Sequence, residues 1–156
     1  MRRYFVHTVL GILLLTMAGM QLLAFPIVAS EIGVSVKIKP KTLNLKENGV
    51  ITAFIEFNNS LYNVSDIDCK SIRLRVEGGV GSVQPIRCIV AEGKLIAKFN
   101  ASVVTGIILT TLGHMQPTPP QAKYSVIVVE GMVKVVEDTV TEEPFKGSYE
   151  IRVILP

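Results

Sequence analysis

The stretch that decides the fold is residues 86–99, Ile-Arg-Cys-Ile-Val-Ala-Glu-Gly-Lys-Leu-Ile-Ala-Lys-Phe. On both sides of Glu92-Gly93-Lys94, apolar and polar side chains alternate with a period of two, which is the spacing of a half-buried β-strand. A short polar segment with glycine between two such runs is typical of a hairpin. We therefore predict a β-hairpin here, with Cys88 on its inward face.

The same period recurs on both sides of this hairpin. Residues 34–39, 71–76 and 148–155 alternate in the same way and predict further strands. Residues 50–57 have apolar side chains at both odd and even positions, as expected of a central strand or of a strand covered on both faces.

The second half of the chain contains three other kinds of segment. Residues 124–136 are rich in β-branched side chains and predict a strand with an interruption at Gly131. Residues 138–146 are expected to connect this strand to the last one. Residues 100–112 predict a short helix, although Val, Ile and Thr are poor helix formers. Residues 113–120 contain three prolines, which cannot donate to a ladder, so they predict an exposed connection.

Together these segments predict an all-β fold: an antiparallel immunoglobulin-like β-sandwich of seven or eight strands with one short helix. An N-terminal apolar helix is expected to precede it. Arg2 and Arg3 are followed by an uncharged run over residues 4–30, which ends in the small-residue site Val-Ala-Ser at 28–30. This pattern predicts a signal peptide that is cleaved before residue 31.

An uncleaved membrane anchor is the alternative for the same segment. At 1.5 Å per residue the run extends about 40 Å as a helix, more than a hydrocarbon core of about 30 Å. In both cases the positive-inside rule places residues 31–156 outside the cell. The chain therefore divides into a signal peptide or anchor (1–30) and an extracellular domain (31–156), and the expected localisation is secreted or cell surface.

The charge of the whole chain comes mainly from the leader. The 156 residues have 16 basic and 13 acidic side chains and a formal charge of +3, whereas residues 31–156 have 14 basic and 13 acidic ones and a charge of +1. This near-neutral balance gives no reason to expect nucleic acid as a partner. The one basic cluster contains Lys37, Lys39, Lys41 and Lys46, which we expect to form a solvated strand face rather than a phosphate site.

Cys69 and Cys88 are the only cysteines, and both lie in the exported part. An even count outside the cell predicts one disulfide, which would stabilise the fold by about 3 kcal/mol. Two buried free thiols are the alternative. A catalytic or metal role is disfavoured, because His114 is the only histidine beyond residue 30 and there is no Cys-x-x-Cys.

Two sets of polar residues are candidate sites. Asn58, Asn63 and Asn100 each begin an Asn-x-Ser sequon and are candidate glycan acceptors, while Asn100 is also a candidate helix cap. Asp66 and Asp68 are weak candidates for a cation, although a turn in which they bond nearby amides is favoured. No catalytic residue, metal or cofactor is expected, because catalysis by the two aspartates would need a third positioned group and a pocket, and the sequence shows neither.

Several segments carry a resemblance to a known family. They are residues 38–46 with 49–51 (IKPKTLNLK, GVI), 64–68 with 71–74 (VSDID, SIRL), 98–100 (KFN), and 143–148 with 151–154 (EPFKGS, IRVI). Over residues 34–154 the chain resembles secreted, surface-exposed β-domains widespread in archaea and bacteria. The resemblance implies a domain that occurs alone or appended to larger surface proteins, with no enzymatic activity.

The chain departs from that family at two places. Many members carry a stretch that looks like a calcium loop where this chain has Ala91-Glu92-Gly93-Lys94, and one acid with a lysine cannot supply six to eight oxygen ligands. Members usually have proline where this chain has Cys69, which makes a bridge to Cys88 a local elaboration.

The function expected from these observations is a non-catalytic structural or interaction domain of the cell envelope. Its partner would be a cell-envelope protein or glycan, and it would meet a membrane only through residues 4–30, if they are uncleaved. The alternative is an extracellular ligand-binding module for carbohydrate or a cation. The absence of tryptophan argues against a sugar platform.

Overall fold

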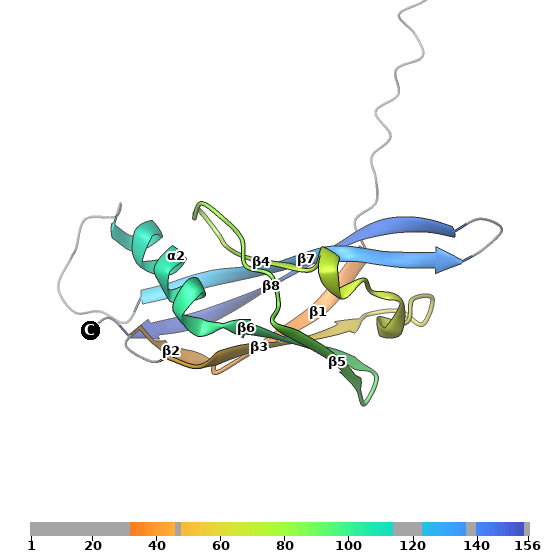
Figure 1. Ribbon diagram of the computed structural model, residues 1–156, viewed down its shortest axis with the longest axis horizontal. Helices are drawn as coiled ribbons and strands as arrows, with labels where there is room; N and C mark the ends of the chain where they lie inside the picture. The colour runs from red at the N-terminus through yellow and green to blue at the C-terminus, as the bar shows by residue number, and fades with distance from the viewer. Residues whose placement is uncertain (1–31, 46–47, 114–122, 137–139, 155–156) are drawn as a thin grey trace, which may run out of the picture. The chain divides into compact units, whose positions relative to one another are not determined.

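The computed structural model describes residues 32–45, 48–113, 123–136 and 140–154, which all belong to one compact unit, residues 31–156 (Figure 1). Within these residues there are eight strands, one α-helix and two 3-10 turns. They are β1 (Ile32–Lys39), β2 (Thr42–Asn44), β3 (Val50–Phe57), η1 (Val64–Asp66), η2 (Cys69–Ser71), β4 (Arg73–Val76), β5 (Arg87–Ala91), β6 (Lys94–Asn100), α2 (Ala101–Gly113), β7 (Lys123–Val136) and β8 (Val140–Ile154). The predicted all-β character and the single helix are thus confirmed.

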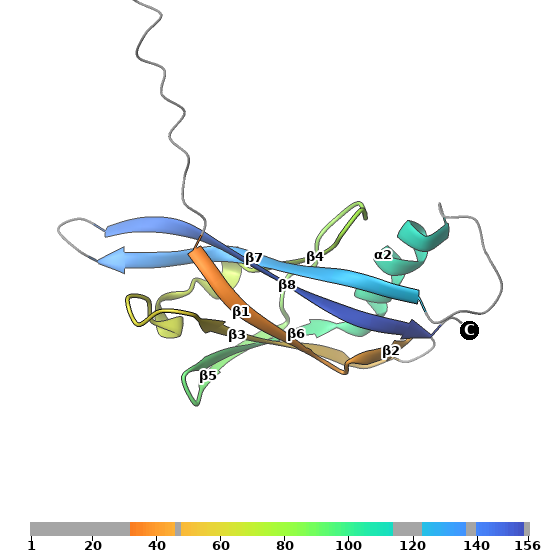
Figure 2. The ribbon, with the colours of Figure 1, turned by 180° about the vertical axis from the view of Figure 1, so that it is seen from behind.

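The strands form one curled sheet in the order β4-β7-β8-β1-β3-β6-β5, with β2 added beside β8. β1 joins the two parts of the sheet. Its residues Ile32 and Gly33 pair with β8, and its remainder from Val34 to Lys39 pairs with β3. Figure 2 shows β1 running from the β7–β8 pair to the side of β3.

The sheet is mixed, so the prediction of a purely antiparallel arrangement is wrong. β1 and β2 both pair with β8 in parallel, whereas the other ladders are antiparallel. The alternation of side chains along a strand predicts which face is buried, but it holds no information on the direction of the neighbouring strand.

One hydrophobic core collects the inward side chains of both parts of the sheet and of α2. Its largest fully buried members are Phe99 on β6 and Phe145 on β8, and Val104 and Ile108 of α2 are also fully buried. β3 lies between β1 and β6, which confirms the prediction of a central strand. It buries Ile51, Ala53 and Ile55 on its inward face.

The predicted hairpin of residues 86–99 is present as β5 and β6. Glu92 and Gly93 both have positive φ, 53° and 70°, as the tight turn of a two-residue hairpin requires.

The predicted helix is present as α2, directly after β6. The Asn100 side chain accepts a hydrogen bond from Ser102 N at 3.0 Å, so Asn100 caps the helix.

Two predictions fail in the second half of the chain. β7 continues through Gly131 without interruption, and residues 140–146, expected as a connection, belong to β8. The two strands pair along their whole length, from Lys123 opposite Val153 to Val136 opposite Val140. Gly131 does not break the strand because it faces Phe145, whose ring occupies the space that a side chain would take.

No helix within the described ranges is long and apolar enough to cross a membrane. The predicted leader or anchor (1–30) lies outside the described residues, as do His114, Lys46 and the proline-rich connection from residue 114 onward.

Candidate functional site

The outward side of β1, β3, β6 and β5 collects basic side chains from three strands. In antiparallel ladders, directly opposed residues project to the same face of the sheet. Since the inward face of these strands is set by the buried residues Val36, Ala53 and Ala97, the residues next to them in sequence point outward. We call this outward side the basic face; its cations are Lys37, Lys39, Arg87, Lys94 and Lys98.

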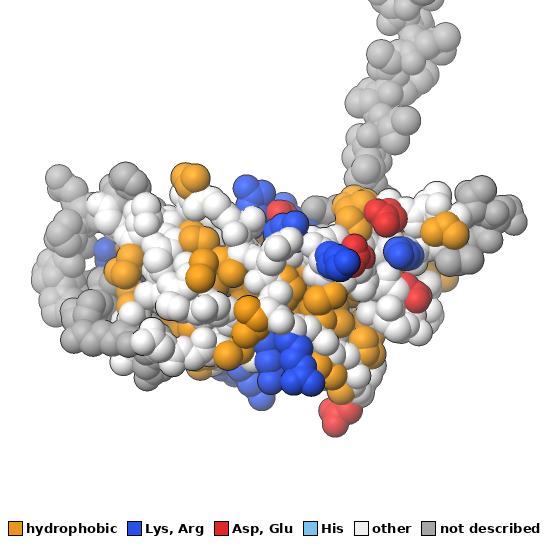
Figure 3. All heavy atoms as spheres, in the orientation of Figure 1, with side chains coloured by type: hydrophobic (Ala, Val, Ile, Leu, Met, Phe, Trp, Pro, Cys, Tyr) orange, Lys and Arg blue, Asp and Glu red, His pale blue; other side chains and the backbone are white. Residues whose placement is uncertain are grey.

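The register places the outward residues in rows that cross the four strands. One row contains Lys39, Thr52, Lys98 and Arg87, in strand order. The next row contains Lys37, Phe54, Ile96 and Ile89. A row of three cations thus lies beside a row with three apolar side chains. Figure 3 shows blue side chains gathered over β5 and β6, next to orange ones.

A groove of about 300 Å³ lies on the basic face. This volume is at the lower end of the range for small-ligand sites. Apolar Phe54 and Ile96 line the groove together with charged side chains of both signs. The full lining is Ser35, Lys37, Lys39, Phe54, Glu56, Ala91, Glu92, Lys94 and Ile96.

Two of the five cations have partners on the face itself. Lys39 Nζ lies 5.4 Å from the centre of the Phe54 ring, within the range of a cation–π contact. Lys94 Nζ lies 3.6 Å from Glu56 Oε2. Among the described residues, Lys37, Arg87 and Lys98 form no ion pair. Their charges are therefore available to an anion from outside the domain.

This arrangement presents positive charge to an anion from outside the domain. The cations are spread along a row and do not converge on one point, so they suit an extended ligand. Two acids line the groove, and one of them, Glu56, forms an ion pair with Lys94. The described residues that line the groove include no histidine or cysteine.

Sequence reasoning found only part of this face. The sequence predicts a solvated strand face with Lys37, Lys39, Lys41 and Lys46. Of these, Lys41 lies beyond the end of β1 and is exposed. Lys94, Lys98 and Arg87 were not connected with them. The alternation of residues 86–99 marks Arg87 and Lys98 as outward, but the lateral order of the strands, which brings them into one row with Lys39, is not encoded in any periodicity.

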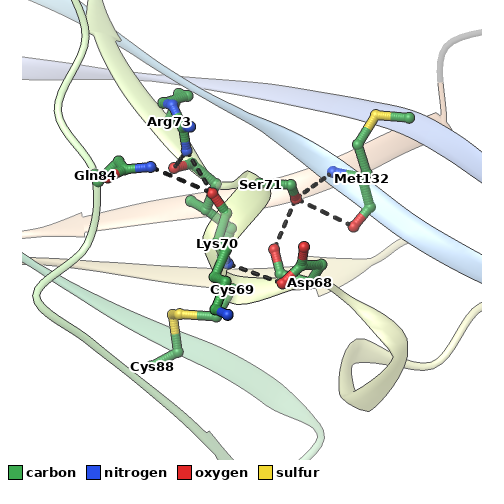
Figure 4. Close-up of a disulfide and its surroundings, with 9 residues drawn as sticks. Asp68, Cys69, Lys70, Ser71, Arg73, Gln84, Cys88 and Met132 are labelled. Carbon is green, nitrogen blue, oxygen red and sulfur yellow. Dashed lines mark hydrogen bonds between the residues drawn. A yellow bond between two sulfur atoms is a disulfide. The ribbon is translucent and has the colours of Figure 1, made fainter.

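The predicted disulfide is present between Cys69 and Cys88, with a Cα–Cα distance of 6.2 Å. It links η2 to β5, and Cys88 projects from β5 toward the core, as expected from the alternation. Figure 4 shows that the bridge lies next to a network of hydrogen bonds around η2. The disulfide thereby ties the edge strand of the basic face to the segment that leads into β4.

Ser71 is the centre of that network. Its Oγ donates to Asp68 O at 2.7 Å and accepts from Met132 N at 2.8 Å (Figure 4). Asp68 N in turn donates to Met132 O at 3.1 Å. β7 extends past Arg73, the first residue of β4, and these bonds satisfy the backbone of β7 where β4 does not pair with it.

The three sequon asparagines are all exposed. Asn58 and Asn63 lie on the loop between β3 and η1. The Oδ1 of Asn63 accepts from Ser65 N at 3.1 Å, and Asn100 caps α2. In Asn63 and Asn100 the hydrogen bond is accepted by the side-chain amide oxygen, whereas a glycan would attach to the amide nitrogen.

Asp66 and Asp68 have different surroundings. Asp68 caps η2, with its Oδ1 accepting from Lys70 N at 3.0 Å, and Asp66 is exposed at the end of η1. Asp66 lines a polar hollow of about 330 Å³ beside the sequon loop. In residues 32–45, 48–113, 123–136 and 140–154, no three His, Cys, Asp or Glu side chains lie close enough together to hold a metal ion.

Comparisons of the chain with protein-family models, with curated proteins and with solved structures find no match.

Proposed function

We propose that residues 31–156 form a non-catalytic interaction domain on the outside of the cell, and that the basic face is its binding surface. The observation that carries this proposal is the row of outward cations across β1, β6 and β5, of which Lys98 and Arg87 have no ion-pair partner among the described residues. Unpaired charges fixed on a rigid sheet recruit and orient a partner of opposite charge.

Two further observations support an extracellular location. A disulfide such as Cys69–Cys88 persists in oxidising compartments and is rare in the reducing cytosol. The leader predicted at residues 1–30 would deliver the domain to such a compartment, either released by cleavage or held by an anchor. The resemblance to secreted, surface-exposed β-domains of archaea and bacteria agrees with both.

The proposal includes an immunoglobulin-like sandwich as the fold. Immunoglobulin domains have the strand order A-B-E-D in one sheet and C-F-G in the other. If β2 is counted as a continuation of the first strand, the order β1-β3-β6-β5 corresponds to A-B-E-D, and β4-β7-β8 corresponds to C-F-G. The shared core of the two groups supports this assignment. Such domains commonly present one sheet face or the loops at one end to a partner.

The location is tested by protein chemistry on cells that produce the full chain. We expect the exported protein to begin at residue 31, or the full chain to be retained in membranes with residues 31–156 accessible to protease from outside. A chain that is protected from external protease in intact cells and has free thiols at Cys69 and Cys88 would contradict the proposal.

The binding surface is tested by photo-crosslinking on intact cells. A photoreactive residue replaces Ile96, which lies on the basic face, and in a matched control it replaces Tyr124, which is exposed on β7. We expect adducts from position 96 and few from position 124. Equal labelling from both positions, or none from position 96, would refute the assignment of the surface, and turnover of a broad hydrolase substrate panel would refute a non-catalytic role.

A further inference from the structure

We propose that the ligand of the basic face is an acidic polysaccharide, a chain of sugars with carboxylate or sulfate groups at regular intervals. This inference rests on the proposed function and names the chemistry of the partner. It follows from the spacing of the cations, from the apolar row beside them and from the comparison with other polyanions.

The cations are arranged for a chain rather than for a single small anion. Adjacent strands lie about 4.8 Å apart, so the row from Lys39 through Lys98 to Arg87 extends over about 14 Å. A single phosphate or carboxylate reaches one or two of these side chains. An extended polymer that lies across the strands can reach all three, and each added contact strengthens binding of the same molecule.

The spacing favours a polymer of moderate charge density. Duplex DNA has one charge per about 1.7 Å of its axis. The row offers cations at intervals of about one and two strand spacings, roughly 5 and 10 Å. A polysaccharide with one acidic group per sugar or per disaccharide has charges at comparable intervals, whereas most phosphates of a nucleic acid would be left without a partner.

The neighbouring row suits the apolar side of a sugar ring. Phe54, Ile96 and Ile89 lie next to the cation row and are all partly exposed. Carbon-bound hydrogens on one side of a pyranose pack against such surfaces, while Thr52, between Lys39 and Lys98 in the row, offers a hydroxyl to the sugar's own hydroxyls. Lys39 over the Phe54 ring brings a charge and this apolar surface into one contact region.

The test uses the full chain in mild detergent, with binding measured by interferometry on immobilised polymers. The acidic probes are polygalacturonate and chondroitin sulfate, and neutral dextran is the uncharged control. Polyglutamate and a single-stranded oligonucleotide represent other polyanions, and free galacturonate represents the single anion. We expect saturable, salt-sensitive binding to an acidic polysaccharide, no binding to dextran, and binding of the monomer at least 100-fold weaker.

The site is tested with two matched triple variants. Lys39→Gln, Arg87→Gln and Lys98→Gln together remove the cation row, and we expect the dissociation constant to rise at least tenfold. Lys70→Gln, Lys134→Gln and Arg152→Gln remove the same charge from exposed positions outside the basic face, and we expect less than a twofold change. An unchanged melting temperature for both variants excludes loss of fold.

The outcomes separate this inference from the proposed function. Equal loss in both triple variants would overturn the site. Tighter binding to the oligonucleotide or to polyglutamate than to both acidic polysaccharides would overturn the ligand class but leave the basic face as a binding surface. Failure of every polyanion to bind, with crosslinks still formed from position 96 on cells, would overturn only the inference. Failure of both experiments would overturn both proposals.

Discussion

Gly131 on β7 lies against the ring of Phe145 on β8, so that a Cβ at Gly131 would come within 2.7 Å of Phe145 Cζ. Phe145 is one of the largest fully buried side chains. The glycine is therefore a requirement of core packing, although it lies inside a strand, where glycine is ordinarily unfavourable.

Replacing Gly131 with alanine is expected to destabilise the domain by about 2 kcal/mol, because the new methyl group must displace the Phe145 ring. Urea unfolding of the full chain in mild detergent measures the effect. Gly106 in α2 is the control, since a Cβ there meets no atom within 4 Å, and Gly106→Ala is expected to stabilise the domain by about 0.5–1 kcal/mol. A neutral Gly131→Ala variant would show that Phe145 can move aside.

Removal of the disulfide is expected to lower the free energy of unfolding by about 3 kcal/mol, because Cys69 and Cys88 lie 19 positions apart and the bridge restricts the unfolded chain. The variant is Cys69→Ala with Cys88→Ala, measured by urea unfolding. Mass spectrometry after alkylation provides the control: without reductant neither cysteine should be modified. An unchanged unfolding midpoint in the double variant would mean that the bridge adds no stability.

Ser71→Ala is expected to cost about 1–2 kcal/mol, because Met132 N loses its acceptor in a partly buried place. Hydrogen exchange at the Met132 amide should accelerate more than exchange at amides in the centre of β7. Ser65→Ala serves as the comparison: Ser65 is exposed, its hydroxyl lies 3.5 Å from Asp66, and we expect a change within about 0.5 kcal/mol. Similar losses in both variants would contradict the assigned role of Ser71.

Asn100 has two candidate roles, which two substitutions separate. Asn100→Ala removes both the helix cap and the glycan acceptor, and it is expected to cost about 1 kcal/mol. Asn100→Asp keeps the capping oxygen but removes the acceptor nitrogen, so stability should remain close to that of the native chain. Thermal unfolding measures the cap, and intact mass in a glycosylating host reports on the acceptor. Equal stability of the Ala and Asp variants would show that the cap is unimportant.

Local sequence patterns predict the elements of this fold better than their assembly. The alternation in residues 86–99 is sufficient for the β5–β6 hairpin and for the inward side of Cys88, since both depend on neighbours in sequence. The start of β8 could not be found in this way. Glu142, Glu143 and Pro144 are unfavourable in strands, yet they belong to β8 because the backbone of β7 pairs with them.

The candidate site shows the same limit. The alternation along each strand shows that the side chains of Lys39 and Lys98 point outward. Their place in one row, however, depends on β3 lying between β1 and β6. That order is set by tertiary packing of the core. A pattern in a single strand therefore indicates a solvated face, and only the assembled sheet shows that three such strands present their charges together.

The parallel pairing of β2 with β8 gives the domain a mechanical property. The ladder lies between two backbone bonds, from Arg152 N to Lys41 O at 3.0 Å and from Leu45 N to Ile154 O at 3.3 Å. Because β1 and β2 run in the same direction as β8, tension that draws residue 32 and residue 154 apart along the strands acts on opposite ends of this pair. The hydrogen bonds are then loaded in shear, all at once, rather than opened one after another as in a hairpin. Tension applied between the two ends of the domain would therefore be resisted by this short ladder.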